Sequence, residues 1–398
     1  NHIAMEFERK KAADVYKKIL VSKTGVLDTN KLFSAKYNDD VFKRNVTIPE
    51  GKNHGLVMII DWSGSMSHNI FGCIKQVIEL TLFCKKVNIP FEVYSFMERD
   101  PQEGYGKDAK FTPRTFKYRH RDFVTDSRVC LRNYMSSRMN AKDYNRGLLN
   151  LCILANRNNQ GANHYRGYYP VPKDDELKST PLNGAILLSE HVIRKFKKDN
   201  HLECVHAVWL TDGEASGGGY WYDATKPVGQ QVSRNEMCKD QCNIYLKDTK
   251  MKKNYLIGTG GYYGRGAGTT PACLDIVKDR LGINQIGFFI VDRFSASNLW
   301  RYVPKHNSPD FRENERQYKE FIANAKKDGY FIKDQAGYDE YYVIRGDNLS
   351  KEIEDLDVKP EMTARKMAIA FMRKNNAFKV NRVILSRFID LITAKTTV

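Results

Sequence analysis

The sequence of 398 residues lacks any apolar run long enough to cross a membrane. Its longest uninterrupted apolar stretches, such as 56–60 and 288–291, fall far short of the roughly 20 residues that a spanning helix needs. No charged and then apolar leader opens the chain, so we expect no secretion signal. The sequence therefore excludes an integral membrane protein, and we expect a cytoplasmic location, in the host cytoplasm if the protein is encoded by a phage.

Motifs of the common catalytic classes are also missing. There is no G-x-x-x-x-G-K-[ST] phosphate loop, no H-E-x-x-H and no G-x-S-x-G element, and no base can be named that would activate a serine nucleophile. The 8 cysteines are spread along the chain, which is typical of reduced thiols rather than of a disulfide framework. We therefore expect a protein that is not an enzyme.

Positive charge is what the chain has in excess. It carries 64 Lys or Arg against 47 Asp or Glu, a formal net charge of +17. Residues 107–166 alone hold thirteen Lys or Arg and four Asp or Glu, a net charge of +9. Attraction to an anionic partner and simple solubility are both open interpretations. With 41% hydrophobic residues the chain can build a core, which excludes global disorder.

Short apolar runs alternate with segments of helical periodicity. Runs typical of parallel strands buried on both faces occur at 55–60, 91–96, 204–210, 286–291 and 340–344. Apolar residues recur at helical spacing in four segments, 70–81, 182–196, 273–281 and 314–326. Because parallel strands need crossover connections, this alternation predicts an α/β fold, a doubly wound and mainly parallel sheet with helices on both faces.

We expect this α/β domain to span residues 51–344, with two long insertions and an extension at each end. The insertion at about 99–178 is basic and too long for a plain loop, so it should hold structure of its own, with a helix at 144–156. The insertion at about 213–270 is rich in glycine and aromatic residues. The extension 1–50 is expected to contain an amphipathic helix at 7–21, and the extension 345–398 two basic amphipathic helices at 362–372 and 380–394.

Carboxylates and hydroxyls follow two of the predicted strands. Asp61, Ser63 and Ser65 form a D-x-S-x-S pattern after the first strand, Thr180 opens a helix, and Asp212 follows the strand at 204–210. The carboxyl ends of parallel strands border the crevice in which such sheets bind ligands. An all-oxygen ligand set suits a hard, octahedral ion, so we expect Mg²⁺ or Mn²⁺ and not zinc. The alternative is that Ser63 or Ser65 is an ordinary helix N-cap.

These residues resemble the von Willebrand factor type A (vWA) family. Its metal-ion-dependent adhesion site consists of D-x-S-x-S, a distant Thr and a later Asp in a D-G pair, which Asp61, Ser63, Ser65, Thr180 and Asp212 match. The resemblance covers roughly residues 55–344. Asp61-Trp-Ser-Gly-Ser-Met66 and Leu210-Thr-Asp-Gly213 look most like the intracellular branch with the cobaltochelatase subunits and their tailed-phage relatives. The chain departs from the chelatase subunits in lacking their long acidic segment.

The resemblance implies a non-catalytic, Mg²⁺-dependent protein-interaction module. Its metal would bind an Asp or Glu of a partner, either an AAA+ ATPase of the MoxR type or a substrate of that ATPase. Any ATPase activity would belong to the partner, and no membrane is involved. One alternative is a structural or assembly protein, for example a phage particle component, in which the metal is a structural staple. A second is a nucleic-acid-binding protein.

The second alternative depends on the basic insertion. In the segment 115–121, Lys117, Arg119 and Arg121 alternate with aromatic residues and His, so in a strand the three cations would share one face. Such a stripe suits an acidic protein surface or a nucleic-acid backbone, and it is also typical of a half-buried strand with a solvated face. We take the three cations as candidate partner-binding residues and favour a protein partner over nucleic acid.

Overall fold

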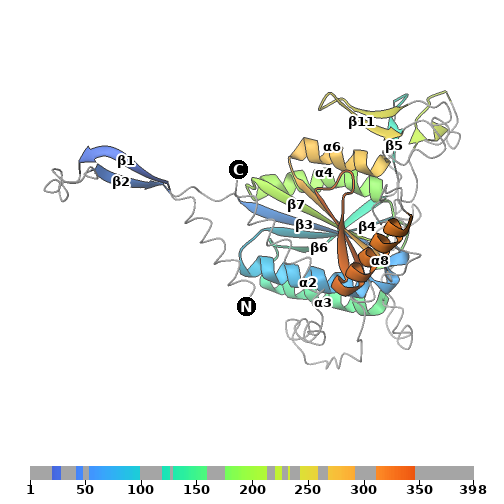
Figure 1. Cartoon of the computed structure of the whole chain (residues 1–398), viewed down its shortest axis with the longest axis horizontal. Helices are drawn as coiled ribbons and strands as arrows, with labels where there is room; N and C mark the ends of the chain where they lie inside the picture. Colours follow the sequence, from blue (N-terminus) through green and yellow to red (C-terminus); the bar gives the residue numbers. More distant parts are fainter. Residues whose placement is uncertain are drawn as a thin grey trace, which may run out of the picture.

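A computed structural model of the chain describes residues 20–27, 42–47, 53–98, 119–125, 129–158, 175–212, 220–225, 232–233, 243–258, 268–291 and 311–345. Its centre is a seven-stranded sheet in the order β13-β14-β12-β7-β3-β4-β6 (Figure 1). The strands in that order are Tyr330–Lys333, Glu340–Arg345, Asn284–Val291, Cys204–Thr211, His54–Asp61, Phe91–Glu98 and Val129–Ser136. β14, β12, β7, β3 and β4 run parallel, whereas β13 and β6 are antiparallel edge strands.

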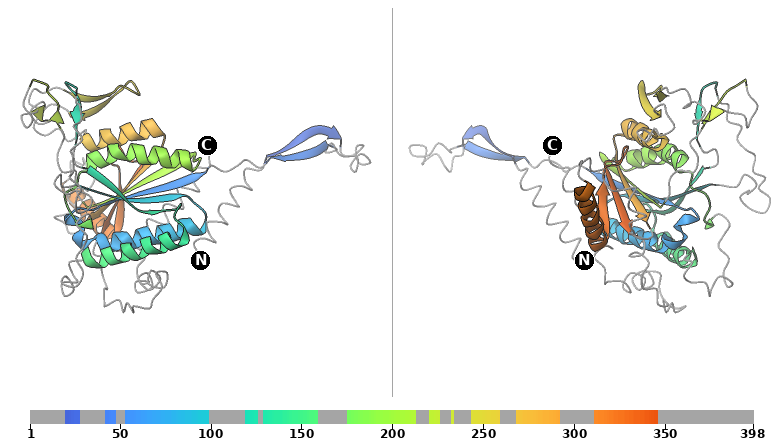
Figure 2. Two further views of the ribbon diagram at one scale, coloured as in Figure 1. Left: turned by 180° about the vertical axis from the view of Figure 1, so that it is seen from behind. Right: turned by 45° about the vertical axis from the view of Figure 1, so that its right-hand side comes forward.

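Helices cover both faces of this sheet, which confirms the predicted α/β fold class. Helices α2 (Ile70–Lys86) and α3 (Ala141–Asn158) lie on one face, and α4 (Leu182–Asp199) and α6 (Thr269–Leu281) lie on the other (Figures 1 and 2). Helix α8 (Phe311–Asp328) packs on β13 and β14 through a separate apolar cluster. In the part of the chain that the structure describes, no helix is both long and apolar enough to cross a membrane.

The central strand β3 shows why the sequence folds this way. Leu56, Met58 and Ile60 belong to the apolar cluster on the α2 side, while Val57 and Ile59 belong to the cluster on the α4 side. All five side chains are fully buried. A strand covered on both faces must be apolar at every position, which explains its continuous apolar run. The last residue of the strand is Asp61, which directly follows this apolar run.

Part of the expected first insertion belongs to the main sheet. Strand β6 pairs antiparallel with β4, and α3 packs beside α2. The expected insertions also meet each other, because β5 (Phe123–Val124) from the first pairs with β8 (Tyr220–Trp221) from the second, and β8 pairs with β9 (Val232–Ser233). The hairpin of β10 (Ile244–Asp248) and β11 (Lys253–Gly258) packs on α6.

The expected N-terminal helix at 7–21 is wrong at its end. Leu20 and Val21 belong to strand β1 (Leu20–Leu27), which pairs antiparallel with β2 (Phe42–Thr47). The rest of that predicted helix lies outside the described residues. The predicted helices at 362–372 and 380–394 also lie outside them.

Candidate functional site

Asp61 stands at the carboxyl end of β3 with its side chain fully buried. One carboxylate oxygen, Oδ2, accepts a hydrogen bond of 2.6 Å from the Thr211 hydroxyl. The other, Oδ1, is buried without a hydrogen-bond partner. Burial raises the pKa of this carboxyl group to about 7, against the lowering effect of hydrogen bonds from Thr211 and Ser63. A buried, unsatisfied carboxylate oxygen is costly, and it marks a place where a cation would be favourable.

Ser63 and Ser65 connect the carboxyl end of β3 to the carboxyl end of β7. The hydroxyl oxygens of Ser63 and Ser65 are 3.0 Å apart. The Ser65 hydroxyl donates a hydrogen bond of 2.8 Å to Oδ1 of Asp212, which directly follows β7. The side chain of Ser63 also reaches Asp61. The structure therefore brings Asp61, Ser63, Ser65 and Asp212 into one chain of contacts, as the sequence pattern predicts.

Thr180 lies on the segment that runs beside the D-x-S-x-S turn. Lys178 forms a parallel bridge with Ser63, in which the Gly64 amide donates to the Lys178 carbonyl at 2.8 Å and the Lys178 amide donates to the Trp62 carbonyl at 3.1 Å. Thr180 follows two residues later, is largely buried, and comes immediately before Pro181 and α4. These backbone hydrogen bonds hold the segment that contains Thr180 beside the D-x-S-x-S turn.

The serines are not helix N-caps. Ser65 is the first residue of a short 3-10 helix, η2 (Ser65–His68), whose N-cap is Gly64. The N-cap of α2 is Asn69, and neither cap residue makes a side-chain capping hydrogen bond. The N-cap interpretation of Ser63 and Ser65 is therefore wrong, because their hydroxyls contact each other and Asp212 instead.

A second group of residues stabilises the D-x-S-x-S turn through the Trp62 side chain. Trp62 is fully buried, and its indole N–H donates a hydrogen bond of 2.8 Å to the Asp175 carbonyl. The Asp175 carboxylate accepts a 2.8 Å hydrogen bond from the Tyr134 hydroxyl and lies 3.2 Å from Arg132. Asp175 and Tyr134 are 41 positions apart, so no local sequence pattern marks them. Thr211 could have been found, because it directly precedes Asp212 at the same strand end.

The donor set fits a hard divalent cation. Asp61 and Asp212 are close enough for the charge of Asp212 to raise the pKa of Asp61, and a cation between two carboxylates would relieve this repulsion. Every predicted ligand atom is a carboxylate or hydroxyl oxygen, as Mg²⁺ prefers. Among the described residues there is no group of three or more His, Cys, Asp and Glu side chains that could hold a metal, so the site would depend on hydroxyls.

The predicted cationic stripe is not a strand where the structure describes it. Arg119 and Arg121 lie in a turn that comes before β5, and Arg121 has a left-handed backbone with φ of 71°. The Asp122 carboxylate accepts the Arg119 amide at 2.7 Å, which closes the turn. The prediction of a strand across 119–121 is therefore wrong. Lys117 lies outside the described residues.

The mixed, mainly parallel sheet agrees with the fold expected of a vWA-like domain. No family model matches the chain, and no curated protein matches it. Two crystal structures of the pilus adhesin SpaC from Lactobacillus rhamnosus GG are similar at TM-scores of 0.33 and 0.34, with 14% and 12% identity. Each match covers 88% of this chain and 32% of the adhesin. The chain thus spans about a third of the length of that protein.

Proposed function

We propose that the protein is a non-catalytic, Mg²⁺-dependent protein-interaction module of the vWA type. The observation that carries this proposal is the buried Oδ1 of Asp61, which lacks a hydrogen-bond partner beside Ser63, Ser65 and Asp212. These residues and Thr180 would hold the cation, directly or through water. When bound, Mg²⁺ or Mn²⁺ supplies a positive charge that a carboxylate of a partner protein can bind.

The protein's own residues set up this binding. Thr211 holds Asp61 through Oδ2, while Oδ1 is buried without a hydrogen-bond partner among the described residues. Ser65 ties the turn to Asp212, and the Trp62 indole anchors the turn to Asp175. The site is thus preorganised by contacts from β3, β7 and the segment before α4. The partner class we favour is an AAA+ ATPase of the MoxR type or a substrate of that ATPase.

The metal part of the proposal is tested by thermal or urea unfolding with Mg²⁺, with Mn²⁺ and with EDTA. A ligand at a hundred times its dissociation constant stabilises a protein by about 2.7 kcal/mol, so saturating metal should raise the free energy of unfolding by about that much. The variant Asp61→Asn should lose this response but stay folded in EDTA, because it removes a buried charge. Asp328→Asn, the same change at an exposed helix end, is the control. A metal response that persists in Asp61→Asn would contradict the proposal.

The partner part is tested with a purified MoxR-type AAA+ ATPase from the same source. Affinity should fall at least about tenfold when EDTA replaces Mg²⁺ or when Asp61 is changed to Ala, because one charge-assisted contact contributes about 1.5–3 kcal/mol. Equal affinity under all three conditions would refute a metal-mediated contact. Sedimentation in the same buffers tests the assembly alternative, which predicts self-association that does not respond to EDTA. Nucleic-acid binding predicts an affinity that falls steeply with salt.

A further inference from the structure

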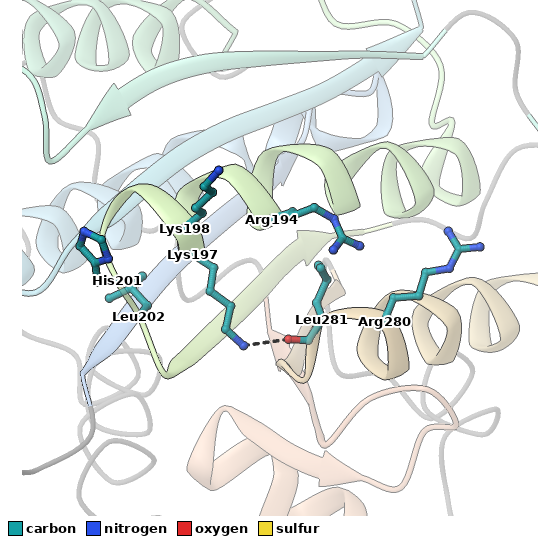
Figure 3. Close-up of a pocket in the computed structure, with 7 residues that line it drawn as sticks. All are labelled: Arg194, Lys197, Lys198, His201, Leu202, Arg280 and Leu281. Atoms are coloured by element: carbon teal, nitrogen blue, oxygen red, sulfur yellow. Dashed lines mark hydrogen bonds between the residues drawn. The ribbon is translucent and has the colours of Figure 1, made fainter. Parts of the chain in front are cut away.

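A cavity of about 450 Å³ lies between the C-terminal ends of α4 and α6, and four of the residues that line it are Lys or Arg. Seven residues line it, namely Arg194, Lys197, Lys198, His201, Leu202, Arg280 and Leu281 (Figure 3). None of them is acidic. Cavities of 300–1,000 Å³ are of the size that binds small molecules.

This cavity is at the opposite end of the sheet from Asp61. Leu202 comes just before β7 and Leu281 just before β12, so both mark the amino ends of parallel strands. Asp61 and Asp212 lie at the carboxyl ends. A strand of eight residues is about 25 Å long, so the basic cavity is separate from the candidate metal site.

The cations that line the cavity come from two helices. Lys197 on α4 reaches across to α6, where its ammonium group donates a hydrogen bond of 2.9 Å to the Leu281 carbonyl. The side chains of Arg194 and Arg280 lie on one side of Lys197, and the Lys198 ammonium points away from it (Figure 3). An ammonium group has three donors and a guanidinium five, so Arg194, Lys197 and Arg280 each have more donors than their hydrogen bonds to the described residues use.

Two carboxylates neutralise only part of the positive charge of these cations. Glu190 contacts both Arg194 at 2.6 Å and Arg280 at 2.5 Å, and Asp248 contacts Arg280 at 2.7 Å. Neither carboxylate lines the cavity. Placing a lysine at a helix C-terminus is common because it complements the helix dipole, and this explains Lys197. Arg194 lies before the last turn of α4 and pairs with Glu190 four residues earlier on the same helix.

We propose that this cavity binds a phosphate-type anion, either free phosphate or the phosphate group of a small molecule. Arginine matches the oxygen geometry of phosphate with paired donors, and lysine supplies a point charge. Lys197 would supply an ammonium ligand, and Arg194 and Arg280 would supply guanidinium donors from one side of it. The apolar carbons of Leu202 and Leu281 line the rest of the cavity.

The test is calorimetric titration of the full chain with inorganic phosphate, pyrophosphate and AMP in EDTA, so that no divalent cation joins the anion to the acidic end. Pyrophosphate should bind more tightly than phosphate because it carries more charge. AMP binding more tightly than phosphate would identify a phosphorylated small molecule as the ligand, and equal affinity would identify free phosphate. No binding by any of the three at millimolar concentration would overturn the proposal.

Matched variants locate the binding. Lys197→Gln should weaken pyrophosphate binding about tenfold, the effect of one hydrogen bond to a charged group. Lys195→Gln removes the same charge from an exposed position on the same helix that does not line the cavity, and it should change the affinity less than about twofold. Equal losses in the two variants would mean non-specific attraction to a basic protein and would overturn the site. Loss of binding in Asp61→Ala would place the anion at the other end of the sheet and would also overturn it.

Discussion

Replacing Arg280 should destabilise the protein more than replacing any neighbouring surface cation. This side chain joins three elements, because it donates from Nε and Nη2 to the two oxygens of Asp248 on β10 at 2.7 and 2.9 Å and from Nη1 to Glu190 on α4 at 2.5 Å. Arg280 is 19% exposed, Glu190 7% and Asp248 0%. The two ion pairs attach the β10–β11 hairpin and α4 to α6.

The expected loss of folding stability follows from the burial of Asp248. Hydrogen bonds from Arg280 are the largest cause that lowers the pKa of Asp248 from 3.8 to about 2. A shift of roughly two units corresponds to about 2.5 kcal/mol at neutral pH. Removing one partner of a buried pair typically costs about 3–5 kcal/mol. Asp248 keeps a 2.8 Å hydrogen bond from the Lys250 amide, so we expect Arg280→Gln to lose about 3 kcal/mol.

The pH dependence has a definite sign. The folded pKa of Asp248 is below its unfolded value, so the pair stabilises the fold fully above about pH 5 and loses this contribution as the pH falls towards 2. By pH 3 about half of it should be gone. The difference in stability between the wild type and Arg280→Gln should therefore shrink between pH 7 and pH 3.

Urea unfolding followed by circular dichroism measures this difference, and hydrogen exchange of the β10 and β11 amides shows whether the hairpin opens alone. Lys278→Gln is the matched control. It lies on the same helix in a half-exposed pair of 2.7 Å with Asp339, and it should cost less than about 1 kcal/mol. A variant Arg280→Gln that is no less stable than Lys278→Gln, with hairpin amides that exchange at the wild-type rate, would refute this role of Arg280.

Two further predictions concern the core. Gly287→Ala should destabilise the protein by about 1–3 kcal/mol in urea unfolding, because the added methyl group would overlap the Tyr341 ring, whereas Gly64→Ala, with its nearest neighbour 4.0 Å away, should change it by less than about 0.5 kcal/mol. Burial raises the pKa of Cys152 to about 12, so at pH 8 this thiol should react with iodoacetamide only after unfolding. Mass spectrometry of labelled peptides checks this, with the half-buried Cys130 as the internal comparison.

The sequence predicts those strands that are buried on both faces along their length. β3 and β7 are covered on both faces, so their continuous apolar runs reveal them. The edge strand β6 is half-buried for most of its length and contains Arg132 and Asn133, so it has no such run. The segment 119–121 shows the opposite failure, because its alternation suggests a strand but the left-handed Arg121 makes a turn.

The same distinction applies to the candidate site. Asp61, Ser63 and Ser65 are close in the sequence, and Asp212 ends a strand that can be recognised as the neighbour of theirs. Their proximity therefore follows from the order of parallel strands. Asp175 supports the same turn through a backbone carbonyl, 113 positions from Trp62. A carbonyl is present in every residue, so the sequence carries no signal for this contact.

Net charge by segment is a poor guide to where an anion would bind. The basic segment 107–166 contains half of the excess charge, yet two of its arginines are used internally, since Arg132 pairs with Asp175 and Arg138 with Glu92 at 2.9 Å. The cavity lined by Lys197 lies outside that segment. Its cations come from two helices whose contacting residues are 84 positions apart, so no window along the chain shows them together. Only the packing of α4 against α6 brings these cations to one cavity.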